Sequence, residues 1–137
     1  MKHVVAVVAV IVRGSQVLAM RRASHKVGAG LWETVSGRVE IGEDPRATAA
    51  REIAEETNLR VRLALQPVDA YSARRGDDPM VVIVYRADTV DAEVHRSDEH
   101  DAHAWLSMEE FRQRCTLGRL VEAVERAITQ GEVETLA

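Results

Sequence analysis

The sequence predicts an α/β sandwich in which β-strands are interleaved with two or three helices. Apolar runs of strand length, rich in β-branched residues, recur along the chain. Segments whose apolar residues recur at helical spacing occur in the middle and near the end. A length of 137 residues suits a single sizeable core, so we expect one domain over residues 1–137.

The first two predicted strands form a β-hairpin. Residues 4–12 are a continuous apolar run, which is typical of a strand covered on both faces. A turn at Gly14 separates this run from a second strand over residues 16–20. The N-terminal run superficially resembles a secretory segment, but it is too short to cross a bilayer and lacks a convincing cleavage site. We therefore expect a buried strand and a cytoplasmic protein with no membrane contact.

A third strand and the first helix follow a basic loop. Residues 31–35 are predicted to form a strand that leads into Gly37. Asp44 and Pro45 predict a helix start, because Asp caps a helix N-terminus and Pro suits the first helical position.

Beyond this helix, short strand patterns alternate with polar segments. Alternation over residues 60–65 suggests a strand, which Pro67 bends or ends. The polar residues 71–79 are interpreted as a turn, and residues 80–86 as another buried strand. An acidic segment over residues 87–103 comes next.

Two helices are expected at the C-terminal end, after a strand that contains Trp105. Ser107 and Glu110 form a capping-box pattern, which predicts a helix that reaches about Cys115. An apolar stripe at helical spacing predicts the last helix, with Leu117, Leu120, Val121, Val124 and Ile128 on its buried face.

Composition limits the classes of function. The formal net charge of −4 gives no global attraction to nucleic acid polymers or anionic membranes. A small anionic substrate would therefore need local capture by a metal and a few basic side chains. Cys115 is the only cysteine, which excludes an intrachain disulfide and a zinc ribbon. Its place in a predicted helix favours a structural thiol over a nucleophile.

The helix predicted after Pro45 carries an unusually acidic face. At about 100° per residue, Glu52, Glu55 and Glu56 fall within roughly a 100° arc. The opposite side is apolar and contains Ala47, Ala49, Ala50, Ile53 and Ala54. Like charges at this spacing destabilise a helix, so a compensating partner is expected. Mg²⁺ would suit, since it takes oxygen ligands and shares its remaining sites with water and phosphates. The alternative is a solvated acidic face.

Residues 37–59 combine this acidic face with a fixed preamble. A Gly is followed after five intervening residues by a Glu. Seven further residues separate this Glu from a run that begins with Arg and contains three Glu residues. The matching positions are Gly37, Glu43, Arg51, Glu52, Ile53, Glu55, Glu56 and Leu59. This spacing resembles the signature of the Nudix hydrolases, in their MutT-like form. Asn58 stands where that signature has Gly, and we expect a left-handed backbone there, which Asn tolerates.

The resemblance implies the Nudix fold, with a mixed β-sheet between helices, and a bound divalent metal, Mg²⁺ or alternatively Mn²⁺. The metal ligands that it implies are the backbone carbonyl of Gly37 and the carboxylates of Glu52, Glu55 and Glu56. It also implies an ion pair between Glu43 and Arg51 that orients the ligating carboxylates. The alternative for this pair is a surface ion pair of little energetic weight.

The resemblance leaves the general base open. It is either a glutamate of the signature, Glu55 or Glu56, or a glutamate on a later loop. The later candidate is Glu99, which precedes the strand containing Trp105. A loop carboxylate of this kind can equally be only solvated. His100 and His103 are weaker candidates for a base or an extra ligand, because surface histidines are common.

Basic side chains outside the helix are candidate contacts for substrate phosphates. They are Arg22, Lys26, Arg38 and Arg74. The alternative for each is a solvated loop residue.

The substrate implied by the resemblance is a nucleotide or another organic diphosphate. Residues 73–77, where related hydrolases of ADP-ribose and diadenosine polyphosphates carry a Pro or a Tyr, contain neither. We therefore expect a (d)NTP pyrophosphohydrolase that releases NMP and pyrophosphate. The alternatives are dihydroneopterin triphosphate, ADP-ribose or a nucleotide sugar as substrate, or a Nudix-like module that binds nucleotides without hydrolysis. Dimers are common in the family, so a homodimer is also an expectation.

Overall fold

The computed structural model describes residues 2–136, and it describes side chains up to residue 130. The strands in this range are β1 (Val4–Arg13), β2 (Gln16–Arg22), β3 (Trp32–Glu33), β4 (Val35–Arg38), β5 (Arg62–Leu63), β6 (Asp69–Arg75), β7 (Asp78–Asp88) and β8 (His100–Leu106). The helices are α1 (Pro45–Thr57), α2 (Met108–Arg114) and α3 (Gly118–Leu136).

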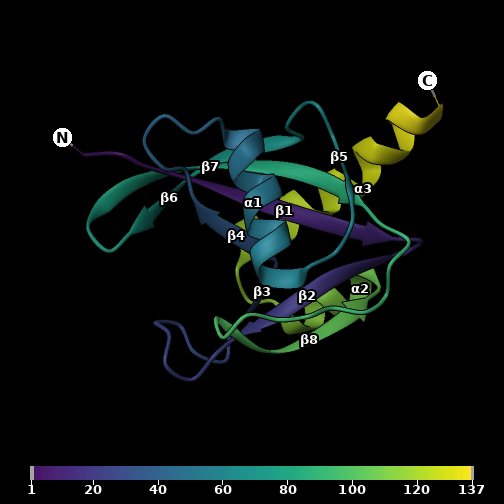
Figure 1. Ribbon diagram of the computed structural model, residues 1–137, viewed down its shortest axis with the longest axis horizontal. Coiled ribbons are helices and arrows are strands. Elements are labelled where there is room, and N and C mark those ends of the chain that lie inside the picture. The colour runs from purple at the N-terminus through teal and green to yellow at the C-terminus, as the bar shows by residue number, and fades with distance from the viewer. Residues whose placement is uncertain (1, 137) are drawn as a thin grey trace.

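Strand β1 is the centre of a mixed sheet (Figure 1). It runs parallel to β7, from Val4 opposite Met80 to Val12 opposite Asp88. On its other side it pairs antiparallel with β4 along its first half and with β2 only at its end. Strands β3 and β8 pair with β2, while β5 and β6 pair with successive stretches of β7.

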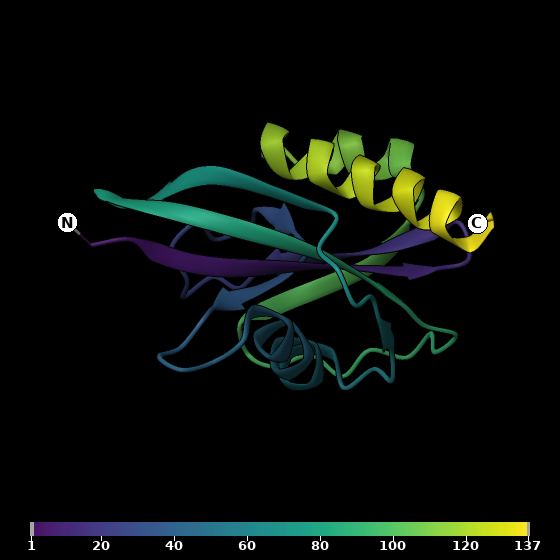
Figure 2. The ribbon, with the colours of Figure 1, turned by 90° about the horizontal axis from the view of Figure 1, so that it is seen from above.

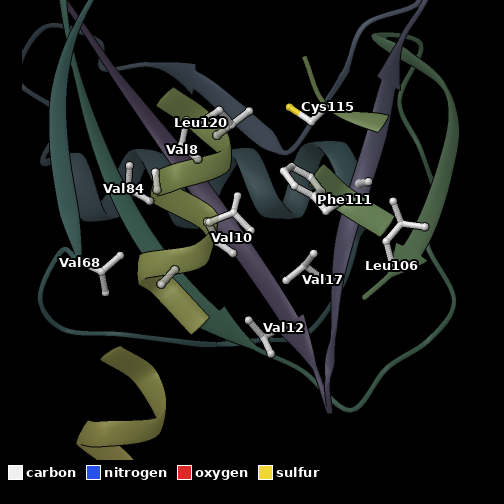
Figure 3. Packing of buried hydrophobic residues seen from close by; sticks show 14 of the residues in the cluster. Val8, Val10, Val12, Val17, Val68, Val84, Leu106, Phe111, Cys115 and Leu120 are labelled. Atoms are coloured by element: carbon white, nitrogen blue, oxygen red, sulfur yellow. The ribbon is translucent and has the colours of Figure 1, made fainter. Parts of the chain in front are cut away.

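Helices cover both faces of the sheet, with α1 on one face and α2 and α3 on the other (Figure 2). The predicted α/β sandwich with a mixed sheet is therefore confirmed. Two covers are needed because β1 is apolar on both faces. Val10 packs with Phe111 of α2 and the buried side of α3 (Figure 3). Ile11, the next residue, packs with Ile53 of α1.

The turn expected over residues 71–79 is wrong in its extent. Strands β6 and β7 continue through this range, and only Gly76 and Asp77 lie between them. Although the segment is polar, Tyr71 and Ala73 pack against the core, while Ala70, Ser72 and Arg74, which alternate with them, are exposed. Such alternation is what an edge strand with one buried face requires, and here it outweighs the polar composition.

Other expected strands are present with shifted ends. The strand expected over residues 31–35 is interrupted at Thr34, which separates β3 from β4. The strand expected over residues 60–65 is reduced to β5, which pairs with the end of β7. The N-terminal apolar run forms β1, as expected. Within residues 2–136, no helix is both long enough and apolar enough to cross a membrane.

Candidate metal centre and substrate groove

Helix α1 carries the acidic residues, and both of its ends are capped. At the start, Asp44 Oδ1 accepts a hydrogen bond from the Arg46 N–H at 2.9 Å. At the end, Asn58 has φ of 57° and ψ of 21°, and its N–H donates to the Ala54 carbonyl. The left-handed backbone expected at Asn58 is therefore confirmed. These caps fix where α1 starts and stops.

Three carboxylates converge beside this helix. Glu52, Glu56 and Glu99 each offer an oxygen atom, and these atoms all lie within 4.8 Å of one another. Glu52 and Glu56 are one helical turn apart on α1, whereas Glu99 directly precedes β8. The structure thus brings together two of the predicted ligands and the predicted loop glutamate.

Gly37 of β4 lies directly against Glu52. A Cβ atom on Gly37 would lie 2.2 Å from the Cδ atom of Glu52, which is an impossible contact. The absence of a side chain at this position therefore lets the Glu52 carboxylate lie against the backbone of β4. Gly37 is adjacent to the carboxylate cluster, as its predicted role as a ligand requires.

Glu56 is the most buried of the three carboxylates, with 2% of its surface exposed. Burial, reinforced by the neighbouring Glu99 and Glu52, raises the pKa of Glu56 to about 10. Its Oε2 atom has no hydrogen-bond partner among the residues that the structure describes. A buried carboxylate oxygen without a partner is costly, and a divalent cation would satisfy it. The cluster therefore fits a hard divalent cation in both its ligand type and its unmet charge.

Burial also raises the pKa of Glu52, although the Arg51 guanidinium opposes this effect. For Glu99, partial burial acts in the same direction, but contact with Glu56 and the charge of Lys26 lower its pKa overall. Lys26 Nζ lies 3.6 Å from Glu99 Oε1. Lys26 and Glu56 thus favour the ionised form of Glu99. Burial favours the protonated form of Glu56.

Arg51 links the cluster to the loop that precedes α1. Its guanidinium donates two hydrogen bonds to Glu43, of 2.9 Å and 3.0 Å, and one of 2.9 Å to Glu52. The Arg51 hydrogen bonds, with one from Thr48, lower the pKa of Glu43 to about 2. The ion pair expected between Glu43 and Arg51 is present, and the same arginine restrains Glu52.

Glu55 lies outside the three-carboxylate cluster. Its side chain is 57% exposed and lies 3.5 Å from the Arg51 guanidinium, in an i,i+4 ion pair. Its role as a metal ligand or general base remains a prediction.

We expect the metal-free protein to lose stability as the pH rises, because of Glu56. The folded state raises the pKa of Glu56 from 4.5 to about 10, so it binds this proton more tightly than the unfolded state does. The associated stability is complete below about pH 4.5 and is lost as the pH rises towards about 10. Glu56→Gln cannot ionise, so in EDTA its Tm should fall less between about pH 5 and pH 9 than that of the wild type. Equal Tm changes in the two proteins would contradict a buried, protonated Glu56.

The two histidines considered as a base or ligand differ in their surroundings. The imidazole of His100 is 2% exposed and lies between Glu33 and Glu56. His103 is partly buried, and its Nδ1 lies 2.6 Å from an Arg96 nitrogen. Burial, together with Arg96, lowers the pKa of His103.

Glu33 is a residue of this site that the sequence did not indicate, because it belongs to no helical pattern and to no motif. Only the pairing of β2 with β3 and with β8 brings Glu33 to His100.

A groove of about 900 Å³ lies on the sheet face that α3 covers. Its floor includes β1, β4, β6 and β7, and its lining extends to Gly37 beside the cluster. The arginines that line it are Arg22, Arg38, Arg74, Arg75 and Arg119. Three of the predicted phosphate contacts thus line the groove, while the fourth, Lys26, contacts Glu99. A basic groove in an acidic protein favours a local anionic ligand.

The comparisons with known proteins agree with this geometry. Residues 2–127 match the family model described as the NUDIX domain. A MutT-like protein of Streptomyces ambofaciens is 33% identical over 129 residues, which cover 91% of this chain and 79% of that protein. The CTP pyrophosphohydrolase of Escherichia coli (strain K12) is 30% identical over 116 residues, which cover 82% of each protein.

Two further matches define the extent of the similarity. A protein of Myxococcus xanthus named octanoyltransferase is 35% identical over 119 residues, or 82% of this chain. The match covers 32% of that protein, so this chain spans about a third of its length. The crystal structure of a MutT protein from Methanosarcina mazei Go1 has a TM-score of 0.81 at 25% identity, and the match covers 94% of this chain and 95% of that one. The resemblance drawn from residues 37–59 is thereby confirmed: the chain belongs to the NUDIX domain family.

Proposed function

We propose that the protein hydrolyses a phosphoanhydride bond of a nucleoside triphosphate in a divalent-metal-dependent reaction, releasing NMP and pyrophosphate. The observation that carries this proposal is that an arginine-lined groove reaches Gly37, which lies against Glu52 of the three-carboxylate cluster. The cluster suits a cation and the groove suits the phosphates of an anionic substrate.

In this proposal Mg²⁺ is the resident cation and Mn²⁺ is its substitute. The residues that would hold it are Glu52, Glu56 and Glu99, with the backbone of Gly37 and with Glu55 as a further ligand. When bound, the cation neutralises phosphate charge and makes a water molecule a better nucleophile. Arg51 holds Glu52 in place through its hydrogen bond and is itself held by Glu43.

The groove supplies the substrate contacts in this proposal. Arg22, Arg38 and Arg74 line the groove, and we propose them as the phosphate contacts, since guanidinium groups match phosphate oxygens in geometry and charge. Among the described residues, Tyr71 is the one aromatic residue that lines the groove. The Arg119 guanidinium lies 4.6 Å from the centroid of its ring. This ring offers an apolar surface on which a nucleobase could stack.

A nucleoside triphosphate is favoured over the other organic diphosphates for two reasons. The MutT-like and CTP pyrophosphohydrolase relatives match this chain along most of their own length. The groove is also bordered by several arginines, which suits three consecutive phosphates. A module that only binds nucleotides is disfavoured, because the signature carboxylates Glu52, Glu55 and Glu56 are all present in the sequence.

Product analysis tests this function. The purified protein would be incubated with Mg²⁺ and each of a panel of dNTPs, NTPs, oxidised dGTP, dihydroneopterin triphosphate, ADP-ribose and dinucleoside polyphosphates. We expect NMP and pyrophosphate from at least one nucleoside triphosphate, and no products when EDTA replaces Mg²⁺. Turnover restricted to ADP-ribose or dinucleoside polyphosphates would replace the proposed substrate class. Tight binding without any product would identify a binding module.

A further inference from the structure

A chain of polar contacts, partly exposed at Arg22 and buried at His100 and Glu56, connects the substrate groove to the carboxylate cluster. At the groove, Arg22 Nη1 donates to both carboxylate oxygens of Glu33, at 3.2 Å and 3.3 Å. The Oε2 atom of the same carboxylate also lies 2.8 Å from His100 Nε2, so Glu33 contacts both Arg22 and His100. Arg22 and Glu33 thus hold one side of the His100 imidazole.

The opposite side of the His100 ring faces Glu56. His100 Nδ1 lies 3.6 Å from Glu56 Oε1, and both side chains are almost fully buried, at 2% and 3% exposure. Neither His100 Nδ1 nor Glu56 Oε2 has a hydrogen-bond partner within the described residues. Unsatisfied buried polar atoms are uncommon in a protein core, so these two, on neighbouring side chains, call for an explanation other than packing.

The backbone accounts for the placement of His100. It lies opposite Arg22 in the pairing of β2 with β8, where the register shifts between Arg21 and Arg22. Directly before it, the Glu99 carbonyl accepts a hydrogen bond from the Ala23 N–H at 3.0 Å. The start of β8 is therefore attached to β2, and His100 is directed into the interior while Glu99 reaches the cluster.

We infer that His100 is a positioning residue for Glu56: the Arg22–Glu33–His100 chain fixes the imidazole, and the imidazole fixes the carboxylate that the cation needs. This inference rests on the proposed metal-dependent function. In this inference His100 is neither the general base nor a metal ligand, because its two ring nitrogens face Glu33 and Glu56. Arg51 holds Glu52, whereas no arginine contacts the buried carboxylate of Glu56 among the residues whose side chains the structure describes; we assign that part to His100.

Mn²⁺ affinity, measured from the electron paramagnetic resonance signal of free Mn²⁺, tests this inference. His100→Gln keeps a polar group towards Glu33 and removes the ring nitrogen that faces Glu56. We expect its Kd for Mn²⁺ to rise about tenfold, which is typical of the loss of a residue that orients a metal ligand. The matched control is His95→Gln, which changes an exposed histidine on the preceding segment and should leave the Kd unchanged.

Two results would overturn the inference. His100→Gln that is folded by circular dichroism and binds Mn²⁺ as tightly as the wild type would remove His100 from the positioning of Glu56. If His100→Gln does not fold, Glu33→Gln takes its place, and an unchanged Kd in that variant would have the same meaning. A wild-type protein that binds no Mn²⁺ would refute the proposed function as well, so the two failures are distinguishable.

Discussion

Glu56→Gln is expected to lower kcat on the order of 10²-fold or more while the protein remains folded. The substitution preserves the size of the side chain but removes its capacity to become the anion that a cation requires. Because the pKa of Glu56 is raised to about 10 by burial, the metal-free variant should be at least as stable as the wild type at neutral pH. Steady-state kinetics with saturating Mg²⁺, together with thermal unfolding in EDTA, measure both effects.

Glu93→Gln is the control for this result. It makes the same substitution at a side chain that is 85% exposed, and it should leave kcat unaltered. A Glu56→Gln variant with nearly wild-type turnover would remove Glu56 from the reaction, whatever its effect on stability.

Glu99→Gln is expected to have the second largest effect, with turnover also reduced on the order of 10²-fold. Its oxygen lies within 4.8 Å of those of Glu52 and Glu56, so we expect the affinity for Mn²⁺ to fall as well. The measurement is kcat as a function of pH, combined with the Kd for Mn²⁺. A changed pH–rate profile with unchanged affinity would assign Glu99 as the general base instead of a ligand. Wild-type turnover would exclude both roles.

The sequence predicted the acidic part of the site because that part is local. Residues Glu52 and Glu56 follow the helical period, so their convergence could be derived from spacing alone. The same period placed Glu55 on that face, yet the structure pairs it with Arg51, four residues earlier. Spacing shows which direction a side chain leaves the helix, but not which of two partners it takes.

The parts that the sequence did not predict depend on strand pairing. His100 belongs to an acidic, polar stretch that suggests a solvated loop, and only the register of β8 against β2 buries it. Glu33 meets His100 for the same reason, 67 residues apart in the chain. The polar hairpin around Gly76 likewise becomes two strands through pairing between β6 and β7. Contacts between residues far apart in the sequence depend on how two strands are aligned with each other. The hydrophobic pattern within each segment does not specify that alignment when the segments are distant in the chain.

Manganese located directly by anomalous scattering, in crystals grown with Mn²⁺, tests the central claim. We expect a peak bounded by carboxylate oxygens of Glu52, Glu56 and Glu99, next to the backbone of Gly37. The claim would be contradicted if no peak appeared there at a Mn²⁺ concentration that supports turnover.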